Sequence, residues 1–314
     1  MKTYVARRLM GLLFVWLAIA TIVFALLRFV PGDPATILLG SEATPQQLEE
    51  LRVQLGLTRS IAAQFTEWMT HVIQGDLGSS LLSKRPVMDE MLERLPRSLE
   101  LACLATLVSV LIAIPSGVIA AVRRGTVWDQ GLLSVALAGI CIPSFVLALL
   151  LIFCFSVELR WFPLRGYHPR SDGFLLWLWY LTLPALAYGF VQAAELARMT
   201  RSAMIEIVSL DFVRTARSKG LPERSVIYHH ALRNALIPIV TLVGINLGVL
   251  LSSTVAIEYI FGIPGIGSLL VDAIRNRDYP IVQGVILGVA TMYTLLNLIV
   301  DVSYTYLDPR IRYR

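Results

Sequence analysis

The residues that could carry out chemistry are few in this sequence, and their spacing forms no recognisable reactive site. His229 and His230 are neighbours, so on a helix their side chains point about 100° apart and are poor joint metal ligands. The sequence contains no G-x-x-x-x-G-K-[ST] segment to cradle the phosphates of ATP and no G-x-S-x-G segment to present a nucleophilic serine. We therefore expect no catalytic residue, no metal site and no cofactor in this chain.

The cysteines likewise indicate no reactive site. Cys103, Cys141 and Cys154 all fall inside apolar runs, they are odd in number, and no two of them have the C-x-x-C spacing. Neither a disulfide framework nor a metal site is indicated. We expect them to behave as small hydrophobic side chains in the core or against lipid.

The composition is that of a protein embedded in lipid. Hydrophobic residues make up 56% of the 314 residues and charged residues only 16%, whereas soluble proteins have about 25% charged residues. The net charge of +5 does not indicate a nucleic-acid partner, because the cations flank apolar runs and so serve to orient membrane helices. The expected surroundings are a lipid bilayer.

Six apolar runs are each long enough to cross a bilayer, since a hydrocarbon layer of about 30 Å requires about 20 helical residues. The first run is too long for the core of a cleavable signal peptide, so we expect it to remain as a helix. The predicted spans are residues 9–30, 98–122, 132–157, 174–197, 236–257 and 281–304. The predicted fold class is an all-α integral membrane protein with six transmembrane helices.

Residues 35–97 read as a water-exposed segment with amphipathic helices. Thr44 followed by Pro45 predicts the start of one helix, and residues 61–73, with Phe65 and Trp68, predict a second one at a membrane interface. Residues 87–95 predict a short helix leading into the next span. We therefore expect residues 1–97 to form the first span and an extracytoplasmic segment, and residues 98–314 to form the transmembrane core.

The most basic stretch lies between two predicted spans, at residues 209–238. Its cations would each cost roughly 3 kcal/mol at bilayer depth, so the stretch lies in water. Asp211 to Lys219 predicts a short helix, Gly220 a left-handed cap, and Pro222 the start of a second helix. Such an elbow fits either a docking element for another protein or a pair of helices held on anionic lipid.

The cations also predict the orientation of the chain. With a cytoplasmic N-terminus, the inner side carries many more cations than the short outer loops, as the positive-inside rule requires. The predicted inner cations are Lys2, Arg7, Arg8, Arg123, Arg124, Arg198, Arg201, Arg214, Arg217, Lys219, Arg224, Arg233, Arg310, Arg312 and Arg314, and the outer ones Arg160, Arg165, Arg170, Arg275 and Arg277. Both termini and the basic stretch are expected to be cytoplasmic.

In addition, the chain resembles the permease subunits of bacterial peptide/nickel-type ABC importers, which have the type I transmembrane fold. No single motif would suffice, but their joint order covers nearly the whole chain. The matching segments are Arg7-Arg8, Pro31-Gly-Asp-Pro34, Leu55-Gly-Leu57, Gly75-Asp-Leu-Gly78, Phe212-Val-Arg-Thr-Ala-Arg-Ser-Lys-Gly-Leu221, His230-Ala-Leu-Arg-Asn-Ala-Leu-Ile-Pro238, Phe261-Gly-Ile-Pro-Gly-Ile-Gly267, Arg277-Asp-Tyr-Pro280 and Leu307-Asp-Pro-Arg-Ile-Arg312.

The resemblance implies that residues 199–235 form the cytoplasmic loop that docks on an ATP-hydrolysing subunit. Ala216 and Gly220 match the broad importer pattern, whereas Arg214 and Thr215 replace its glutamate and first alanine. We expect Ala216, Gly220 and Leu221 to provide the fit. Arg214, Arg217 and Arg224 would face an acidic surface on the partner.

The partners implied by the resemblance are a second, homologous permease, two ATPase subunits that bind ATP and Mg²⁺, and an extracytoplasmic solute-binding protein. The solute would be a peptide; glutathione, a nickel or other metal chelate, and an opine-like compound remain alternatives. An ion-coupled secondary transporter would need charges or broken helices at mid-membrane, which these spans show rarely. A membrane-embedded enzyme would need a polar constellation that the sequence lacks.

Polar residues in or near the spans are the candidates for a substrate path, because a polar group in lipid tends to face the protein interior. These candidates are Asn246, Glu258 and Asn297. The pairs Gly244-x-x-x-Gly248 and Gly284-x-x-x-Gly288 would allow helices to approach closely. A short helix at residues 267–276 is expected near the outer mouth, with Leu269, Leu270 and Ile274 toward the membrane, where it would gate solute entry.

Overall fold

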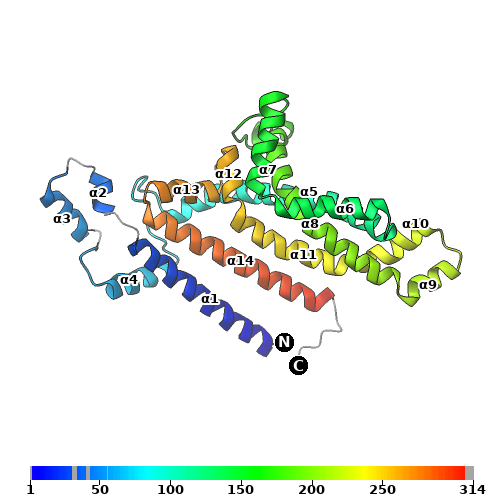
Figure 1. The fold of residues 1–314 in the computed structure, drawn as a ribbon. Coiled ribbons are helices and arrows are strands. Elements are labelled where there is room, and N and C mark those ends of the chain that lie inside the picture. The colour runs from blue at the N-terminus through cyan, green and yellow to red at the C-terminus, as the bar shows by residue number, and fades with distance from the viewer. Residues whose placement is uncertain (1, 30–33, 40–42, 55, 308–314) are drawn as a thin grey trace. The chain divides into compact units, whose positions relative to one another are not determined.

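The protein is helical throughout the part of the chain that the structure describes. The computed structural model covers residues 2–29, 34–39, 43–54 and 56–307 (Figure 1). In these residues β pairing is limited to an isolated bridge between Ser79 and Pro86. The predicted all-α fold class is therefore confirmed, whereas residues 31–33, 55 and 308–312 of the motifs lie outside the described ranges.

The described helices include two π-helical segments, η1 and η3, and a short 3₁₀ segment, η2. In chain order they are α1 (Lys2–Phe29), α2 (Pro34–Leu39), α3 (Pro45–Gln54), α4 (Ile61–Ile73), α5 (Val87–Val122), α6 (Val127–Cys141), α7 (Ser144–Leu151), η1 (Ile152–Glu158), η2 (Arg170–Asp172), α8 (Phe174–Val208), α9 (Asp211–Ser218), α10 (Glu223–Ser225), η3 (Val226–Ala231), α11 (Leu232–Ser253), α12 (Val255–Phe261), α13 (Ile266–Arg275) and α14 (Tyr279–Leu307).

Among the described residues, four helical segments are long and apolar enough to cross a membrane: α5, α8, α14 and the stretch Glu223–Val249 that contains α11. Two bent pairs, α6 with α7–η1 and α12 with α13, pass the same test together and raise the number to as many as six. The set differs from the predicted one. α1 (Lys2–Phe29) contains the first predicted span, of which Leu13–Ala25 is the described apolar part, and α12–α13 was not among the predicted spans.

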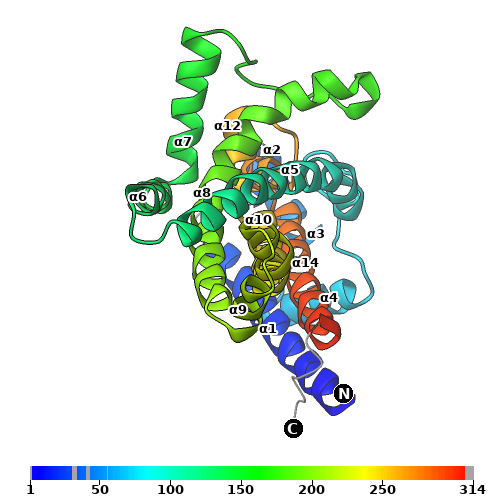
Figure 2. The ribbon, with the colours of Figure 1, turned by 90° about the vertical axis from the view of Figure 1, so that its right-hand side faces the viewer.

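The predicted span at residues 132–157 is not one straight helix. α6 ends at Cys141, and the chain turns by 101° before α7 and η1 continue to Glu158, as Figure 2 shows. Pro143 explains the break, because it has no N–H to donate and forces the residue before it out of the helical region. Accordingly, Ile142 has an extended backbone with φ −85° and ψ 117°.

The chain divides into two compact units. Unit 1 comprises Met1–Pro96 and Pro264–Thr294, and unit 2 comprises Arg97–Ile263 and Leu295–Arg312. In unit 1, α13 and the start of α14 pack on the start of α5 through Leu269, Val285 and Val87. Ala20 of α1 and Met69 of α4 pack on Leu287 of α14. α1 is further joined to α14 by a hydrogen bond that Trp16 Nε1 donates to Thr291 Oγ1 at 3.0 Å.

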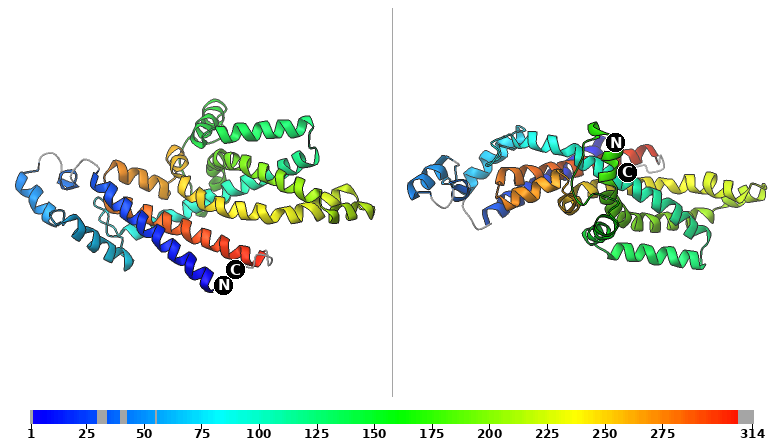
Figure 3. Two further views of the ribbon diagram at one scale, coloured as in Figure 1. Left: turned by 60° about the horizontal axis from the view of Figure 1, so that its bottom comes forward. Right: turned by 90° about the horizontal axis from the view of Figure 1, so that it is seen from above.

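Unit 2 has one large apolar core that joins α5, α8, α9, η3 and α11. Its buried residues are Ala113, Val118, Ala193, Leu196, Ala203, Met204, Val213, Ala216, Val226, Ile227, Ala231, Ala235 and Ile239. Both views in Figure 3 show α8 and α11 side by side, with α9 and α10 at their far end. The elbow is therefore packed on the helices that lead into and out of it.

In unit 1, the structure bears on the predictions made for α4, for residues 87–95 and for α13. α4 has the predicted bounds; Phe65 and Trp68 contact Phe24 of α1, with ring centroids 5.2 and 5.5 Å apart, and a place of α4 at a membrane interface stays a prediction. The lead-in at residues 87–95 is not separate, since α5 continues through Pro96. In α13, Leu269 is buried in the protein core and Leu270 packs against it, while Ile274 is exposed.

Candidate functional site

The elbow at residues 209–238 is a helix–turn–helix, as predicted. The long helix α8 ends at Val208, and Leu210, with φ −73° and ψ 150°, caps α9, which runs from Asp211 to Ser218. The chain then turns through Gly220 into α10, η3 and α11 without a further break. The second helix begins one residue later than expected, because Pro222 occupies the cap and Glu223 the first helical position.

The inner face of α9 is attached to the core of unit 2. Val213 and Ala216, three residues apart and therefore on one face, are 0% and 7% exposed and pack among the buried residues of α8 and η3. Ala216 thus faces its own chain, whereas the expected role in partner fit would require it to face outward. Its small side chain lets α9 lie close to the helices beneath it.

The turn after α9 is held in one conformation by its backbone and by an ion pair. Gly220 has φ +77°, a left-handed conformation that glycine adopts without strain, and its N–H donates to the Arg217 carbonyl at 2.9 Å. Across the turn, Arg217 donates from Nε and from its terminal nitrogen to the Glu223 carboxylate, with a shortest distance of 2.8 Å. This hydrogen bond raises the pKa of the Arg217 guanidinium.

The exposed side chains of the elbow include both cations and apolar groups. Arg214 and Arg224 are exposed, and Arg214 makes only a surface ion pair with Asp211, at 3.1 Å. Phe212 and Leu221 are 42% and 38% exposed. A surface of two cations and two large apolar groups suits a protein partner with an acidic rim and an apolar pocket. We call Phe212, Arg214, Gly220, Leu221 and Arg224 the docking face.

The expected substrate-path residues do not share one environment. Asn246 on α11 and Asn297 on α14 are half-buried. Glu258 on α12 is 0% exposed, and one of its carboxylate oxygens accepts a hydrogen bond from Ser98 Oγ of α5 at 2.6 Å. Glu258 therefore joins two helices in this conformation. A role of Asn246 and Asn297 in a path stays a prediction.

Sequence reasoning missed a polar network that joins α5 to α8 and to the loop before α8. Glu100 Oε2 accepts hydrogen bonds from Tyr167 Oη at 2.8 Å and from Trp177 Nε1 at 2.7 Å. Burial, together with the bond to Glu100, raises the pKa of the Tyr167 hydroxyl to about 12. A lone carboxylate near the start of a predicted span was the signal that could have indicated such an anchor.

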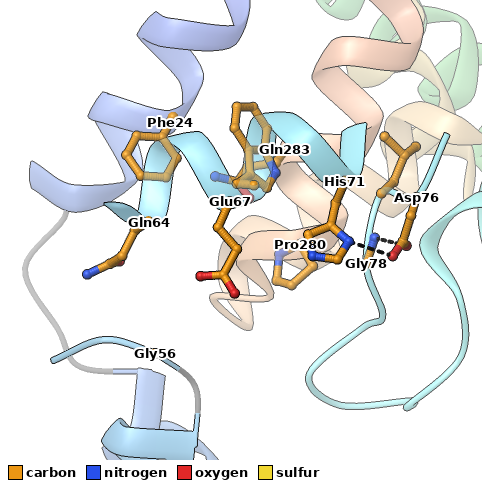
Figure 4. Close-up of a pocket in the computed structure, with 11 residues that line it drawn as sticks. Phe24, Gly56, Gln64, Glu67, His71, Asp76, Gly78, Pro280 and Gln283 are labelled. Carbon is orange, nitrogen blue, oxygen red and sulfur yellow. Dashed lines mark hydrogen bonds and ion pairs between the residues drawn. The ribbon is translucent and has the colours of Figure 1, made fainter. Parts of the chain in front are cut away.

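Unit 1 contains a cavity of about 320 Å³ between α4, the loop after it and the start of α14 (Figure 4). His71 Nδ1 lies 3.3 Å from the carboxylate of Asp76, and the same carboxylate accepts a hydrogen bond from the Gly78 N–H at 2.8 Å. Across the described residues, no group of three or more histidine, cysteine, aspartate or glutamate side chains could hold a metal ion.

Comparison with known proteins gives a family for both parts of the sequence. Residues 113–313 match the family described as the binding-protein-dependent transport system inner membrane component. Residues 1–102 match the family described as the N-terminal part of such membrane components.

Full-length relatives agree with these matches. A protein of Brucella abortus (strain 2308) named as a peptide transport system permease is 43% identical over 313 residues, which cover 100% of both chains. The glutathione transport system permease GsiC of Escherichia coli (strain K12) is 41% identical over 314 residues, again covering 100% of both chains.

Two solved structures show the same fold. The inward-facing MetNI methionine ABC transporter has a chain that matches with a TM-score of 0.58 at 17% identity, covering 70% of this chain and 97% of that one. A chain of an amino acid ABC transporter matches with a TM-score of 0.50 at 16% identity, covering 70% and 94%. With the elbow, the apolar helices and the full-length matches together, this chain belongs to the binding-protein-dependent transport system inner membrane components, the permease subunits of ABC importers.

Proposed function

We propose that this chain forms half of the translocation pore of an importer for peptides or related small solutes, and that its docking face seats on an ATPase subunit. The observation that carries the proposal is the elbow. A short helix anchored to the core on one face leaves cationic and apolar groups exposed on the other.

The mechanism follows from how the elbow is attached. α9 shares one buried core with α8, η3 and α11, so a displacement of α9 by the ATPase moves these helices with it. The helices would tilt about their inner ends, near Ala197 and Leu236, and the pore would open alternately to either side. Arg217 contributes by holding the turn through Glu223, while Arg214 and Arg224 supply charge to the partner.

We assign the remaining subunits in the same way. A second, homologous permease completes the pore, two ATPase subunits bind ATP and Mg²⁺, and an extracytoplasmic binding protein delivers the solute. This chain has no phosphate-binding loop and performs no hydrolysis itself. In this proposal both termini and the elbow lie in the cytoplasm, residues 1–97 form the first transmembrane helix and the extracytoplasmic segment, and residues 98–314 form the transmembrane core.

Peptides are the solute class favoured by the 43% identical relative, and glutathione, itself a small peptide, is favoured by the 41% identical one. Residues that contact the solute are sought among Asn246, Glu258 and Asn297. The test is mass spectrometry of the ligand that co-purifies natively with the matching binding protein. A nickel chelate or an opine-like compound in place of a peptide would contradict the assignment.

Co-purification tests the assembly. The chain is extracted from its own membrane in mild detergent, with a tag at its N-terminus, and the bound subunits are identified. We expect a second permease and an ATPase subunit. A matched variant in which Arg214 and Arg224 are both replaced by Glu should retain the permease partner and lose most of the ATPase. Recovery of equal amounts of ATPase with both proteins would contradict the role of the docking face.

A further inference from the structure

Asp129 and Arg201 form an ion pair that joins α6 to α8 across 72 positions of sequence. Arg201 Nε donates to one carboxylate oxygen of Asp129 at 2.6 Å, and its terminal nitrogen donates to the other oxygen at 2.8 Å. The side chains are 5% exposed for Asp129 and 21% for Arg201. The two parallel hydrogen bonds fix orientation as well as distance, which a single contact would not do.

The carboxylate is held from its own side too. Asp129 lies in the first turn of α6, where a negative charge is favoured by the helix dipole, and it accepts a hydrogen bond from the Gly125 N–H at 2.9 Å. Arg201 stands seven positions before Val208, the last residue of α8, which is about 10 Å along the helix axis. The pair thus sits close to the end of α8 that carries the elbow.

α6 is attached to α8 at a second point. A Cβ added at Gly139 would lie 3.1 Å from the Ala194 side chain and 3.4 Å from that of Phe190, so the two helices touch there. Asp129 pairs with Arg201, whereas Gly139, later in α6, meets Ala194, earlier in α8. The two helices therefore run antiparallel. α6 is therefore fixed to α8 near both ends, by a packing contact at one and an ion pair at the other.

α6 contributes no residue to the buried core that unites α8, α9, η3 and α11 in the described part of unit 2. It is also separated from α7 by the 101° bend at Pro143. Movement of the elbow reaches α8 through the core, and it reaches α6 through these contacts with α8 and through the short connection from α5.

We propose that Asp129 and Arg201 are positioning residues which make α6 follow α8 when the elbow moves, and so keep solute uptake coupled to ATP hydrolysis. The inference rests on the proposed docking of the elbow on an ATPase. Without the pair, α8 would respond to the ATPase while α6 lagged behind, and ATP would be hydrolysed without a matching transport event.

The test measures solute taken up per ATP hydrolysed by the complete transporter in proteoliposomes, a ratio that does not depend on how much protein folds. We expect Asp129→Asn and Arg201→Gln each to lower this ratio about fivefold or more, the lower end of typical coupling between sites. The exchange of both residues, Asp129→Arg with Arg201→Asp, should restore part of it. Arg198→Gln, at an exposed position of the same helix, should leave it unchanged.

An unchanged ratio in both single variants would overturn the proposal. If the variants do not assemble, the test uses the protein with the ion pair intact. The distance is measured between labels at Val135 on α6 and Arg198 on α8, which are both exposed. A distance that stays constant with and without ATP supports the proposal, and one that changes overturns it. Failure of the proposed function is seen separately, as wild-type uptake that does not require ATP hydrolysis.

Discussion

At the scale of single residues, positions 216 and 220 require small residues for different reasons. Ala216 is buried and faces its own core, whereas a Cβ at Gly220 would meet nothing within 4 Å. Space is therefore not what requires glycine at position 220 within this chain. The requirement comes from the φ of +77°, and from the partner surface that we propose lies against it.

Replacing Gly220 by Val should uncouple uptake from ATP hydrolysis while leaving the protein in the membrane. A branched side chain in the left-handed region costs roughly 1–2 kcal/mol and would also hold the partner away from the backbone. Gly220→Asn is the matched control, because asparagine tolerates this conformation better. The measurements are uptake, ATP hydrolysis and the amount of protein in the membrane fraction. Equal uptake by the wild type and the Val variant would count against the docking face.

The bond between Ser98 and Glu258 makes a prediction about stability. In Ser98→Ala, the buried carboxylate loses one of its hydrogen-bond donors, which should lower the free energy of unfolding by about 1–3 kcal/mol. In Glu258→Gln, the side chain keeps an oxygen that can accept the bond, so the loss should be smaller. Thermal unfolding of the two variants in the same detergent compares them. The reverse order of melting temperatures would show that Ser98 does not stabilise this site.

At the scale of the elements, glycines set how closely the helices approach. A Cβ at Gly284 of α14 would lie 2.5 Å from Cγ1 of Val87, and one at Gly288 would lie 2.2 Å from Cε of Met91. The predicted close contact of this glycine pair is confirmed. For Gly244 and Gly248 it stays a prediction.

The two positions differ in how their neighbours can yield. Val87 is β-branched and 0% exposed, whereas Met91 presents the end of a flexible chain. Gly284→Ala should therefore destabilise unit 1 by about 1–3 kcal/mol, and Gly288→Ala by less. Adding Val87→Ala to Gly284→Ala should recover part of the loss. Thermal unfolding in detergent measures all three, and equal losses for the two alanine variants would contradict this packing.

Local signals were enough to predict several elements. Thr44 with Pro45 before α3, and Asp211 with Gly220 around α9, are standard helix ends, and the predicted starts of both helices agree with the structure. The effect of each proline on its helix was harder to predict. Pro96 and Pro238 lie inside helices, while Pro143 separates two of them. The difference depends on the packing of neighbouring helices, which a single sequence does not contain.

At the scale of the whole chain, the helices of unit 2 run in alternating directions. Gly117 of α5 meets Thr200 of α8, and Gly189 of α8 meets Val108 of α5, so positions rise together and the two helices run the same way. α6 runs against α8. This is the order expected when each crossing of a membrane reverses the direction of the chain, whichever side the termini lie on.

Labelling with a membrane-impermeant maleimide can test that orientation. In a background where the native cysteines are replaced by serine, Ser171→Cys in η2 should react in intact spheroplasts. Ser218→Cys in α9 should react only after permeabilisation. Both positions are exposed, so access and not burial decides the result. Reaction of Ser218→Cys from outside would place the elbow on the wrong side for an ATPase.

The helix–turn–helix of the elbow could be predicted from the sequence because its signals are local: cations, a left-handed glycine and a capping proline within a dozen positions. Its inner face could not. Whether Ala216 points toward the partner or toward the core depends on where α8 and η3 lie, and the pairing of Asp129 with Arg201 depends on the approach of two helices distant in sequence. Long-range packing decides both.

The bend at Pro143 lies between two native cysteines that can carry spectroscopic probes. Cys141 is the last residue of α6 and Cys154 lies in η1 beyond the turn, and both thiols are free and exposed. Once Cys103 is replaced by serine, a pair of spectroscopic probes attached to these native positions would straddle the bend. The opening and closing of the angle could then be followed during turnover without adding a single foreign attachment point to the chain.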